Sequence, residues 1–133
     1  MYNYFGIFDL IIISYIKLIK TMSKKDDLMV LYRGSLNDKC GVSNIDEALL
    51  ETVVKGLGPS IYLADASKVS CTDDAEIKRV KDNFCAKKLG MTDESAMAAA
   101  CNAVCEQMGS SNKSKYRAVF YYLLCEHTGK RPA

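Results

Sequence analysis

Apolar residues recur at helical spacing in five segments of the chain, and a glycine lies at or just after the end of each. The predicted helices cover about residues 23–39, 43–56, 73–90, 92–109 and 110–129. The glycines that end them are Gly41, Gly56, Gly90, Gly109 and Gly129. The alternation typical of strands is missing from the sequence. We therefore expect an all-α, compact bundle of about five helices.

A long connection, residues 56–74, separates the second and third helices. It has no sustained periodicity, yet it carries the apolar residues Leu57, Ile61, Leu63 and Val69. A loop with this composition must pack on the domain. We expect an ordered loop with a short helical turn near Ile61.

Three helix starts carry capping signals. Asp73 with Glu76 is an N-cap pattern for the third helix, Thr92 would cap the fourth, and Ser110 or Ser111 the fifth. The predicted buried stripe of the second helix is Ile45, Ala48, Leu49, Thr52 and Val53. That of the fourth is Met97, Cys101, Val104 and Met108, and that of the fifth is Tyr116, Val119, Phe120, Leu123 and Leu124.

Residues 1–21 differ from the rest of the chain. They are apolar and aromatic, but the apolar part is interrupted by Asp9 and extends only from Met1 to Ile16, which is shorter than the roughly 20 residues of a bilayer span. Our leading interpretation is a misassigned translation start, with Met22 as the natural one; the alternative is a hydrophobic anchor. The expected division is therefore an extension, residues 1–21, and one helical domain, residues 22–133. Intact-mass measurement of the native protein decides between them.

Charge and cysteine content exclude few functions. The length of 133 residues suits one domain. The net charge of only +2 gives no general affinity for nucleic acid. Its six cysteines show irregular spacing, and the pair Cys101 and Cys105 lies one helical turn apart. With only one histidine, His127, we expect reduced thiols in a cytoplasmic protein, no metal and no cofactor.

Three stretches in the same order, "GLGPSIYLADASKVSC", "VKDNFCAKKLGM" and "MGSSNKSKYRAVFYYLL", resemble a small bacterial family known as domain of unknown function 2853. The resemblance covers about residues 23–129. It implies a compact helical bundle and no established activity. Residues 1–21 have no counterpart in the family, and Cys85 stands where an aliphatic residue is expected, which argues against a catalytic role for it.

The candidate binding residues lie at the predicted start of the fifth helix: Ser111, Asn112, Lys113, Lys115 and Arg117. Cations near a helix N-terminus are unfavourable, and a lysine at 113 would face an arginine at 117 as a like-charge pair. An anion bound there would relieve both problems. The alternative is a carboxylate of the protein itself, for which Asp65 in the packed loop is the candidate partner.

We interpret the sequence as a non-catalytic binding or self-association module, with a homo-oligomer or another protein as partner. The alternative is anion or nucleic-acid binding through residues 110–117, assisted by the basic third helix from Lys78 to Lys88. Tyr121 and Tyr122 could stack bases, although burial suits their apolar surroundings better. The sequence contains no paired carboxylates, phosphate-binding glycine loop or nucleophile elbow, so we do not favour an enzyme. A membrane partner is expected only if residues 1–21 form an anchor.

Overall fold

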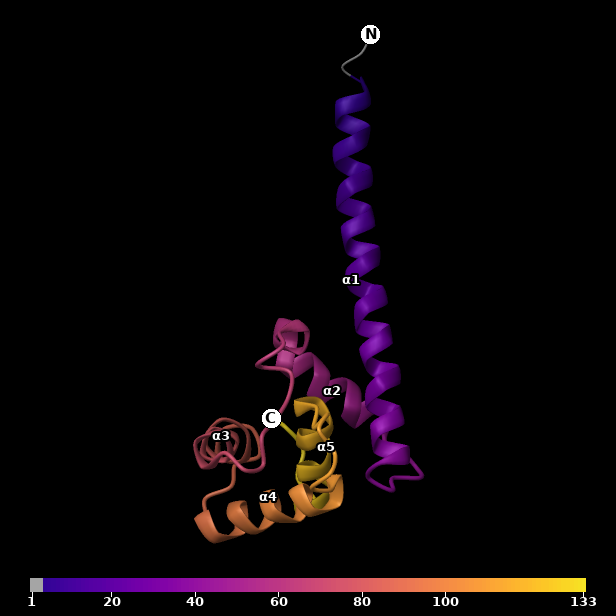
Figure 1. Cartoon of the computed structure of the whole chain (residues 1–133). Helices are drawn as coiled ribbons and strands as arrows, with labels where there is room; N and C mark the ends of the chain where they lie inside the picture. The colour runs from indigo at the N-terminus through magenta and orange to yellow at the C-terminus, as the bar shows by residue number, and fades with distance from the viewer. Residues whose placement is uncertain (1–3) are drawn as a thin grey trace. The chain divides into compact units, whose positions relative to one another are not determined.

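The computed structural model describes residues 4–133, with side chains at 10–18 and 24–133 (Figure 1). Its helices are α1 (Tyr4–Asp38), α2 (Glu47–Leu57), η1 (Gly58–Tyr62), α3 (Asp74–Val80), η2 (Lys81–Ala86), α4 (Glu94–Met108) and α5 (Arg117–Thr128). Within these residues there is one isolated β-bridge and no strand, so the all-α prediction is confirmed. The chain divides into two compact units, one ending at Arg33 and one from Gly34 to Ala133.

The first unit is the greater part of α1. This helix begins well before the predicted helix at residue 23 and includes most of the extension, of which residues 1–3 lie outside the described part. Seven large apolar side chains from Leu10 to Leu18 are between 43% and 68% exposed. No helix in the described part of the chain combines the length and apolar character needed to cross a membrane.

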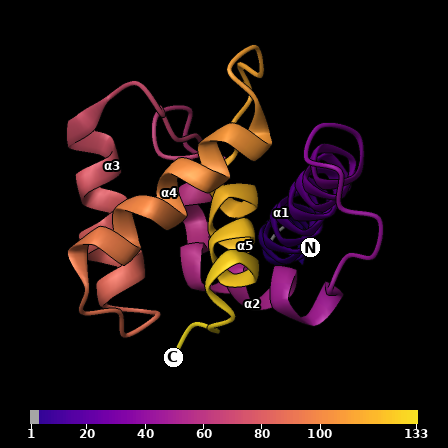
Figure 2. The same cartoon turned by 90° about the horizontal axis from the view of Figure 1, so that it is seen from below.

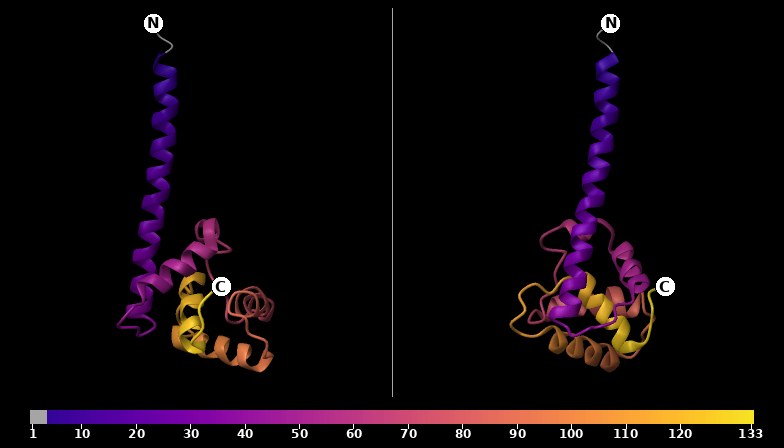
Figure 3. Two further views of the ribbon diagram at one scale, coloured as in Figure 1. Left: turned by 180° about the vertical axis from the view of Figure 1, so that it is seen from behind. Right: turned by 90° about the vertical axis from the view of Figure 1, so that its right-hand side faces the viewer.

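The second unit is built around α5. Every residue from Ala118 to Cys125 is buried, and α5 contacts both α2 and α4 (Figure 2). A helix that is buried on all sides needs apolar residues all round, which "AVFYYLLC" supplies. The chain's C-terminus returns to the turn after η2, where the Ala133 amide donates to the Lys88 carbonyl at 2.9 Å (Figure 3). The core is therefore a central helix covered by others.

The second helix starts later than predicted and buries a different stripe. Asp46 is its N-cap and accepts the Leu49 amide at 3.0 Å. The buried residues are Leu49, Leu50, Val53 and Val54, whereas Ala48 and Thr52 are exposed. Thr52 instead donates its hydroxyl to the Ala48 carbonyl. The turn expected near Ile61 is present as η1, and Ile61 is buried.

The third and fourth helices lie within their predicted ranges, but α3 with the following η2 ends at Ala86 rather than near Gly90, and one cap differs. Asp73 caps α3 and accepts the amides of Ala75 and Glu76, as predicted. The cap of α4 is Asp93 rather than Thr92, since its carboxylate accepts the Ser95 and Ala96 amides. The predicted stripe of α4, from Met97 to Met108, is buried. α3 continues into the wider helical turn η2, where Phe84 stacks on Tyr121 with ring centroids 3.9 Å apart.

The prediction that the fifth helix starts near residue 110 is wrong. α5 begins at Arg117, and its N-cap Tyr116 makes no side-chain cap. Residues 109–116 form a loop, opened by Gly109 with φ +88°. Lys113 is consequently not helical, and the like-charge pair expected with Arg117 does not form. The loop keeps Lys113 and Lys115 out of the helix, while Arg117 remains at the start of α5.

Candidate functional site

Two loops run side by side at the candidate site. Lys68 and Tyr116 form an antiparallel bridge, in which the Val69 amide donates to the Lys115 carbonyl at 2.8 Å. The Arg117 amide donates to the Ser67 carbonyl at 2.7 Å. The long loop before α3 and the loop before α5 are therefore held together by backbone hydrogen bonds.

The Arg117 side chain strengthens this junction. Its guanidinium donates to the carbonyls of Ala66, at 2.7 Å, and Lys68, at 3.2 Å, and to the Tyr121 hydroxyl at 3.3 Å. It also forms an ion pair with Glu76. The Arg117 and Glu76 side chains are only 15% and 12% exposed, so solvent screens this pair weakly.

Glu76 takes the place that the sequence analysis gave to Asp65. That expectation is corrected: Asp65 is exposed, while Glu76, in the first turn of α3, pairs with both Arg79 and Arg117. Burial opposes ionisation of Glu76, but hydrogen bonds from the two arginines outweigh it and lower the pKa of the carboxyl. Lys115 likewise avoids Asp65, since its ammonium donates to the Asn112 carbonyl at 2.5 Å.

Asn112 organises the loop before α5. Its Oδ1 accepts the Ser114 amide at 3.0 Å, and its own amide donates to the Gly109 carbonyl at 3.2 Å. The residue is only 6% exposed, and its Nδ2 has no hydrogen-bond acceptor among the described residues. A buried amide donor without a partner costs about 1–3 kcal/mol.

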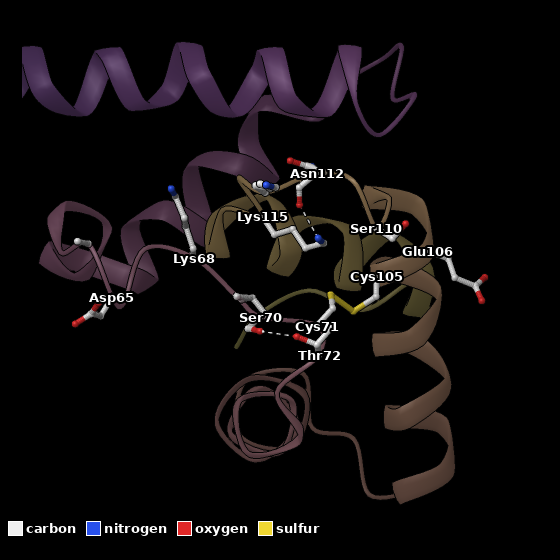
Figure 4. Close-up of a pocket in the computed structure, with 13 residues that line it drawn as sticks. Asp65, Lys68, Ser70, Cys71, Thr72, Cys105, Glu106, Ser110, Asn112 and Lys115 are labelled. Atoms are coloured by element: carbon white, nitrogen blue, oxygen red, sulfur yellow. Dashed lines mark hydrogen bonds between the residues drawn. A yellow bond between two sulfur atoms is a disulfide. The ribbon is translucent and has the colours of Figure 1, made fainter.

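A cavity of about 880 Å³ opens between the two loops and the end of α4 (Figure 4). Its wall includes three of the predicted residues, Asn112, Lys113 and Lys115, together with Asp65. The other lining residues are Ala64, Lys68, Val69, Ser70, Cys71, Thr72, Cys105, Glu106 and Ser110. Ser111 and Arg117 are not among them; Arg117 instead supports the wall from behind through the contacts described above.

The charges around the cavity favour an anion. Lys68, Lys113 and Lys115 outnumber the carboxylates of Asp65 and Glu106. In Figure 4 the two carboxylates lie at opposite ends of the cavity and point away from its middle, and the Lys68 ammonium also points outward, at the Asp65 end. Lys113 is exposed and makes no hydrogen bond or ion pair within the described residues, so its ammonium is available to a ligand.

A disulfide forms part of the same wall. Cys71, in the long loop, is bonded to Cys105 in the last turn of α4, with Cα atoms 6.0 Å apart (Figure 4). The expectation of six reduced thiols is wrong for this pair. Cys101, one helical turn from Cys105, is instead hydrogen-bonded with Cys85. The two bonded cysteines lie 34 residues apart, in a spacing that no sequence motif marks.

The other four cysteines, Cys40, Cys85, Cys101 and Cys125, are buried. A hydrogen bond to Cys101 and burial raise the pKa of Cys85, and burial raises the pKa of Cys125 to about 11. The thiols of Cys85 and Cys125 therefore remain protonated at neutral pH and are poor nucleophiles. The hydrogen bond with Cys85 lowers the pKa of Cys101, whose side chain is nevertheless buried. Among the described residues, no group of three His, Cys, Asp or Glu side chains could hold a metal ion.

The other predicted functional features are occupied by structural contacts. On the basic helix, Lys78 pairs with Asp82 and Lys81 with Glu94. Tyr121 and Tyr122 are buried, so neither ring is available to stack on a base. His127 is hydrogen-bonded through Nε2 to the Gln107 side chain at 2.7 Å.

Residues 31–132 match the family model described as protein of unknown function (DUF2853). The chain belongs to the DUF2853 family. A comparison with curated proteins finds no match. Membership of DUF2853 confirms the resemblance seen in the sequence, and it leaves the role of the cavity to be argued from its geometry.

Lys68, the role of Glu76 and the disulfide are not among the features predicted from the sequence. Lys68 belongs to the loop that was correctly expected to pack on the domain, and its charge is the one signal in the sequence for its place in the cavity. Glu76 was read only as part of a capping pattern. Its pairing with Arg117, 41 residues away, depends on the tertiary fold and has no local signal.

Proposed function

We propose that this DUF2853 protein binds a small anionic ligand in the cavity between the two loops, without catalysing a reaction. The observation that supports this best is the presence of three lysines, Lys68, Lys113 and Lys115, in the wall of one cavity. A carboxylate or phosphate group can accept charge-assisted hydrogen bonds from several ammonium groups together.

The alternative partner, nucleic acid, has less support. The basic helix is largely neutralised by Glu76, Asp82 and Glu94, and the candidate stacking tyrosines are buried. A cavity with its cations grouped around a recess suits a compact anion better than an extended phosphate backbone.

Titration calorimetry with citrate and with inorganic pyrophosphate tests the proposal. We expect binding at low salt that weakens as salt screens the lysines. Lys113→Gln should weaken binding by about two- to fivefold, the value of one partly screened charge. Lys55→Gln is the matched control, since Lys55 is exposed on α2 and does not line the cavity. Absence of binding to either anion, or equal losses in both variants, would contradict the proposal.

We propose self-association as a second function of the chain that begins at Met1, as opposed to one that begins at Met22, and a separate observation supports it. The exposed apolar residues of α1 include four in succession, Leu10 to Ile13, which cover a full helical turn. A helix that is apolar all round is normally buried against a partner. A second copy of the same helix provides such a surface without any other protein.

A further inference from the structure

The Cys71–Cys105 disulfide shares a wall with the lysines of the proposed anion site. We propose that the cavity is a site of thiol–disulfide exchange, in which a small thiol carrying a carboxylate is held by the lysines and attacks this disulfide. The inference rests on the proposed anion binding and adds to it the chemical class of the ligand and its reaction.

Access distinguishes this pair from the other cysteines. Cys71 and Cys105 are partly exposed and line the cavity, whereas the four remaining cysteines are buried. A thiol entering the cavity can therefore meet the disulfide and no other sulfur.

The surrounding charge favours the reaction at two points. Positive potential from Lys68, Lys113 and Lys115 raises the local concentration of an anionic thiol. The same potential stabilises the cysteine thiolate that leaves when the disulfide breaks. The outward placement of the Asp65 and Glu106 carboxylates in Figure 4 limits the opposing repulsion.

The exchange proceeds in two steps, each of which breaks one disulfide bond and forms another. The thiolate of the small thiol attacks one cysteine sulfur and forms a mixed disulfide, while the other cysteine leaves as a thiolate and takes a proton from water. A second molecule of the thiol attacks the sulfur of the first and releases the protein thiolate, which is protonated in turn. Two small thiols are oxidised to their disulfide, and the protein disulfide gains two electrons and two protons.

The loops do not depend on the disulfide alone for their positions. The disulfide joins the long loop to the end of α4, whereas the backbone bonds from Val69 to Lys115 and from Arg117 to Ser67 join the long loop to the segment before α5 without it. The cavity can therefore persist when the disulfide opens, as an exchange site requires.

Three small thiols that differ only in their end group test the inference: 3-mercaptopropionate is anionic, 2-mercaptoethanol neutral and cysteamine cationic. The oxidised full chain is mixed with each, quenched with acid, and the mixed disulfide is measured by mass spectrometry. Each rate is expressed per thiolate and divided by the rate of the same thiol with bis(2-hydroxyethyl) disulfide, which removes intrinsic nucleophilicity. At low salt we expect 3-mercaptopropionate to exceed cysteamine by about five- to tenfold.

Lys113→Gln should reduce this preference by about two- to threefold, and Lys55→Gln should leave it unchanged. Raising the salt to about 1 M should abolish the preference in the natural protein, which provides a second test that needs no substitution. Equal normalised rates for the three thiols, a preference unaffected by Lys113→Gln, or absence of any mixed disulfide would overturn the inference.

Citrate binding distinguishes failure of the exchange inference from failure of the proposed anion-binding function. If citrate binds and slows 3-mercaptopropionate but not cysteamine, both proposals are supported. If citrate binds while the three thiols react equally, only the exchange inference fails. If citrate and pyrophosphate do not bind, the anion site itself fails, and the exchange inference fails with it.

Discussion

At the scale of single residues, Arg117 and Glu76 determine where the two loops lie. Arg117 is the first residue of α5, a position where a cation is unfavourable because the helix dipole is positive there. Burial opposes its charge, but hydrogen bonds to Tyr121 and Glu76 outweigh this and raise the pKa of the guanidinium. The carboxylate that compensates for the poor helix start thus also fastens the loops.

Glu76→Gln should lower the free energy of unfolding by about 2–3 kcal/mol at pH 7, because it leaves Arg117 without its charged partner in a position that is largely buried from solvent. Folding lowers the pKa of Glu76, so its ionised form stabilises the protein above the ordinary carboxyl pKa of about 4.3. This stabilisation is lost as the pH falls through the lowered pKa that Glu76 has in the folded protein. Urea unfolding at a series of pH values should therefore show the two proteins converging in acid.

Glu106→Gln is the control for this experiment. Glu106 is exposed on α4 and forms no ion pair within the described residues, so its replacement should change the unfolding free energy by less than about 0.5 kcal/mol. If the Glu76 and Glu106 variants lose equal stability, the ion pair does not have the role assigned to it.

Tyr122 makes a second long-range contact at residue scale. Its hydroxyl accepts the Asp46 amide at 2.8 Å, which ties the middle of α5 to the cap of α2. Burial raises the pKa of Tyr122 to about 12, so the phenol is neutral at neutral pH. Tyr122→Phe should cost about 1 kcal/mol in urea unfolding, because the amide loses its acceptor. Tyr15→Phe, at an exposed site on α1, should cost almost nothing, and a similar loss in both would contradict this assignment.

At the scale of elements, helix existence could be predicted from the sequence better than helix ends. The apolar periodicity correctly indicated helices and the buried face of α4, and Asp73 correctly marked the start of α3. The start of α5 was wrong because Ser110 has the chemistry of an N-cap, yet residues 109–116 form their hydrogen bonds with Asn112 and with the distant loop at 67–69. Hydrogen bonds between segments this far apart in the sequence determine the path of the loop, and the local spacing of residues does not predict them.

The site was predictable in part for the same reason. Asn112, Lys113 and Lys115 are adjacent in sequence, so a local cluster of cations pointed to them. Lys68 and Cys71 join them only through the antiparallel bridge between the loops. The charge pattern therefore found three of the thirteen residues that line the cavity, and contacts distant in sequence bring most of the others to them.

The disulfide links the long loop covalently to α4, and it should stabilise the second unit against unfolding. Closing a loop between residues 34 apart restricts the unfolded chain by about 3–4 kcal/mol. We expect dithiothreitol to lower the urea midpoint of the natural protein by a corresponding amount. The double variant Cys71→Ser/Cys105→Ser should start from the lower midpoint and be insensitive to the reductant. A midpoint unchanged by reduction in the natural protein would show that this link contributes little.

At the scale of the whole molecule, its two units present different surfaces. The unit from Gly34 to Ala133 buries its apolar residues around α5 and leaves a cationic cavity open. The helix of the other unit leaves large apolar residues from Leu10 to Leu18 exposed. The first surface is suited to a small anion and the second to another apolar surface, so the two proposed functions use separate parts of the chain and can be tested independently.

Light scattering of the full chain should give a mass above that of the monomer, because pairing of α1 segments removes this apolar surface from water. Ile12→Glu/Ile16→Glu places two carboxylates one turn apart on the exposed helix and should return the protein to monomer. Leu63→Glu introduces the same charge at an apolar residue that is also exposed, at 59%, but lies outside α1. It should leave the mass unchanged. A monomeric natural protein at high concentration, or equal dissociation by Leu63→Glu, would show that residues 10–18 do not mediate self-association.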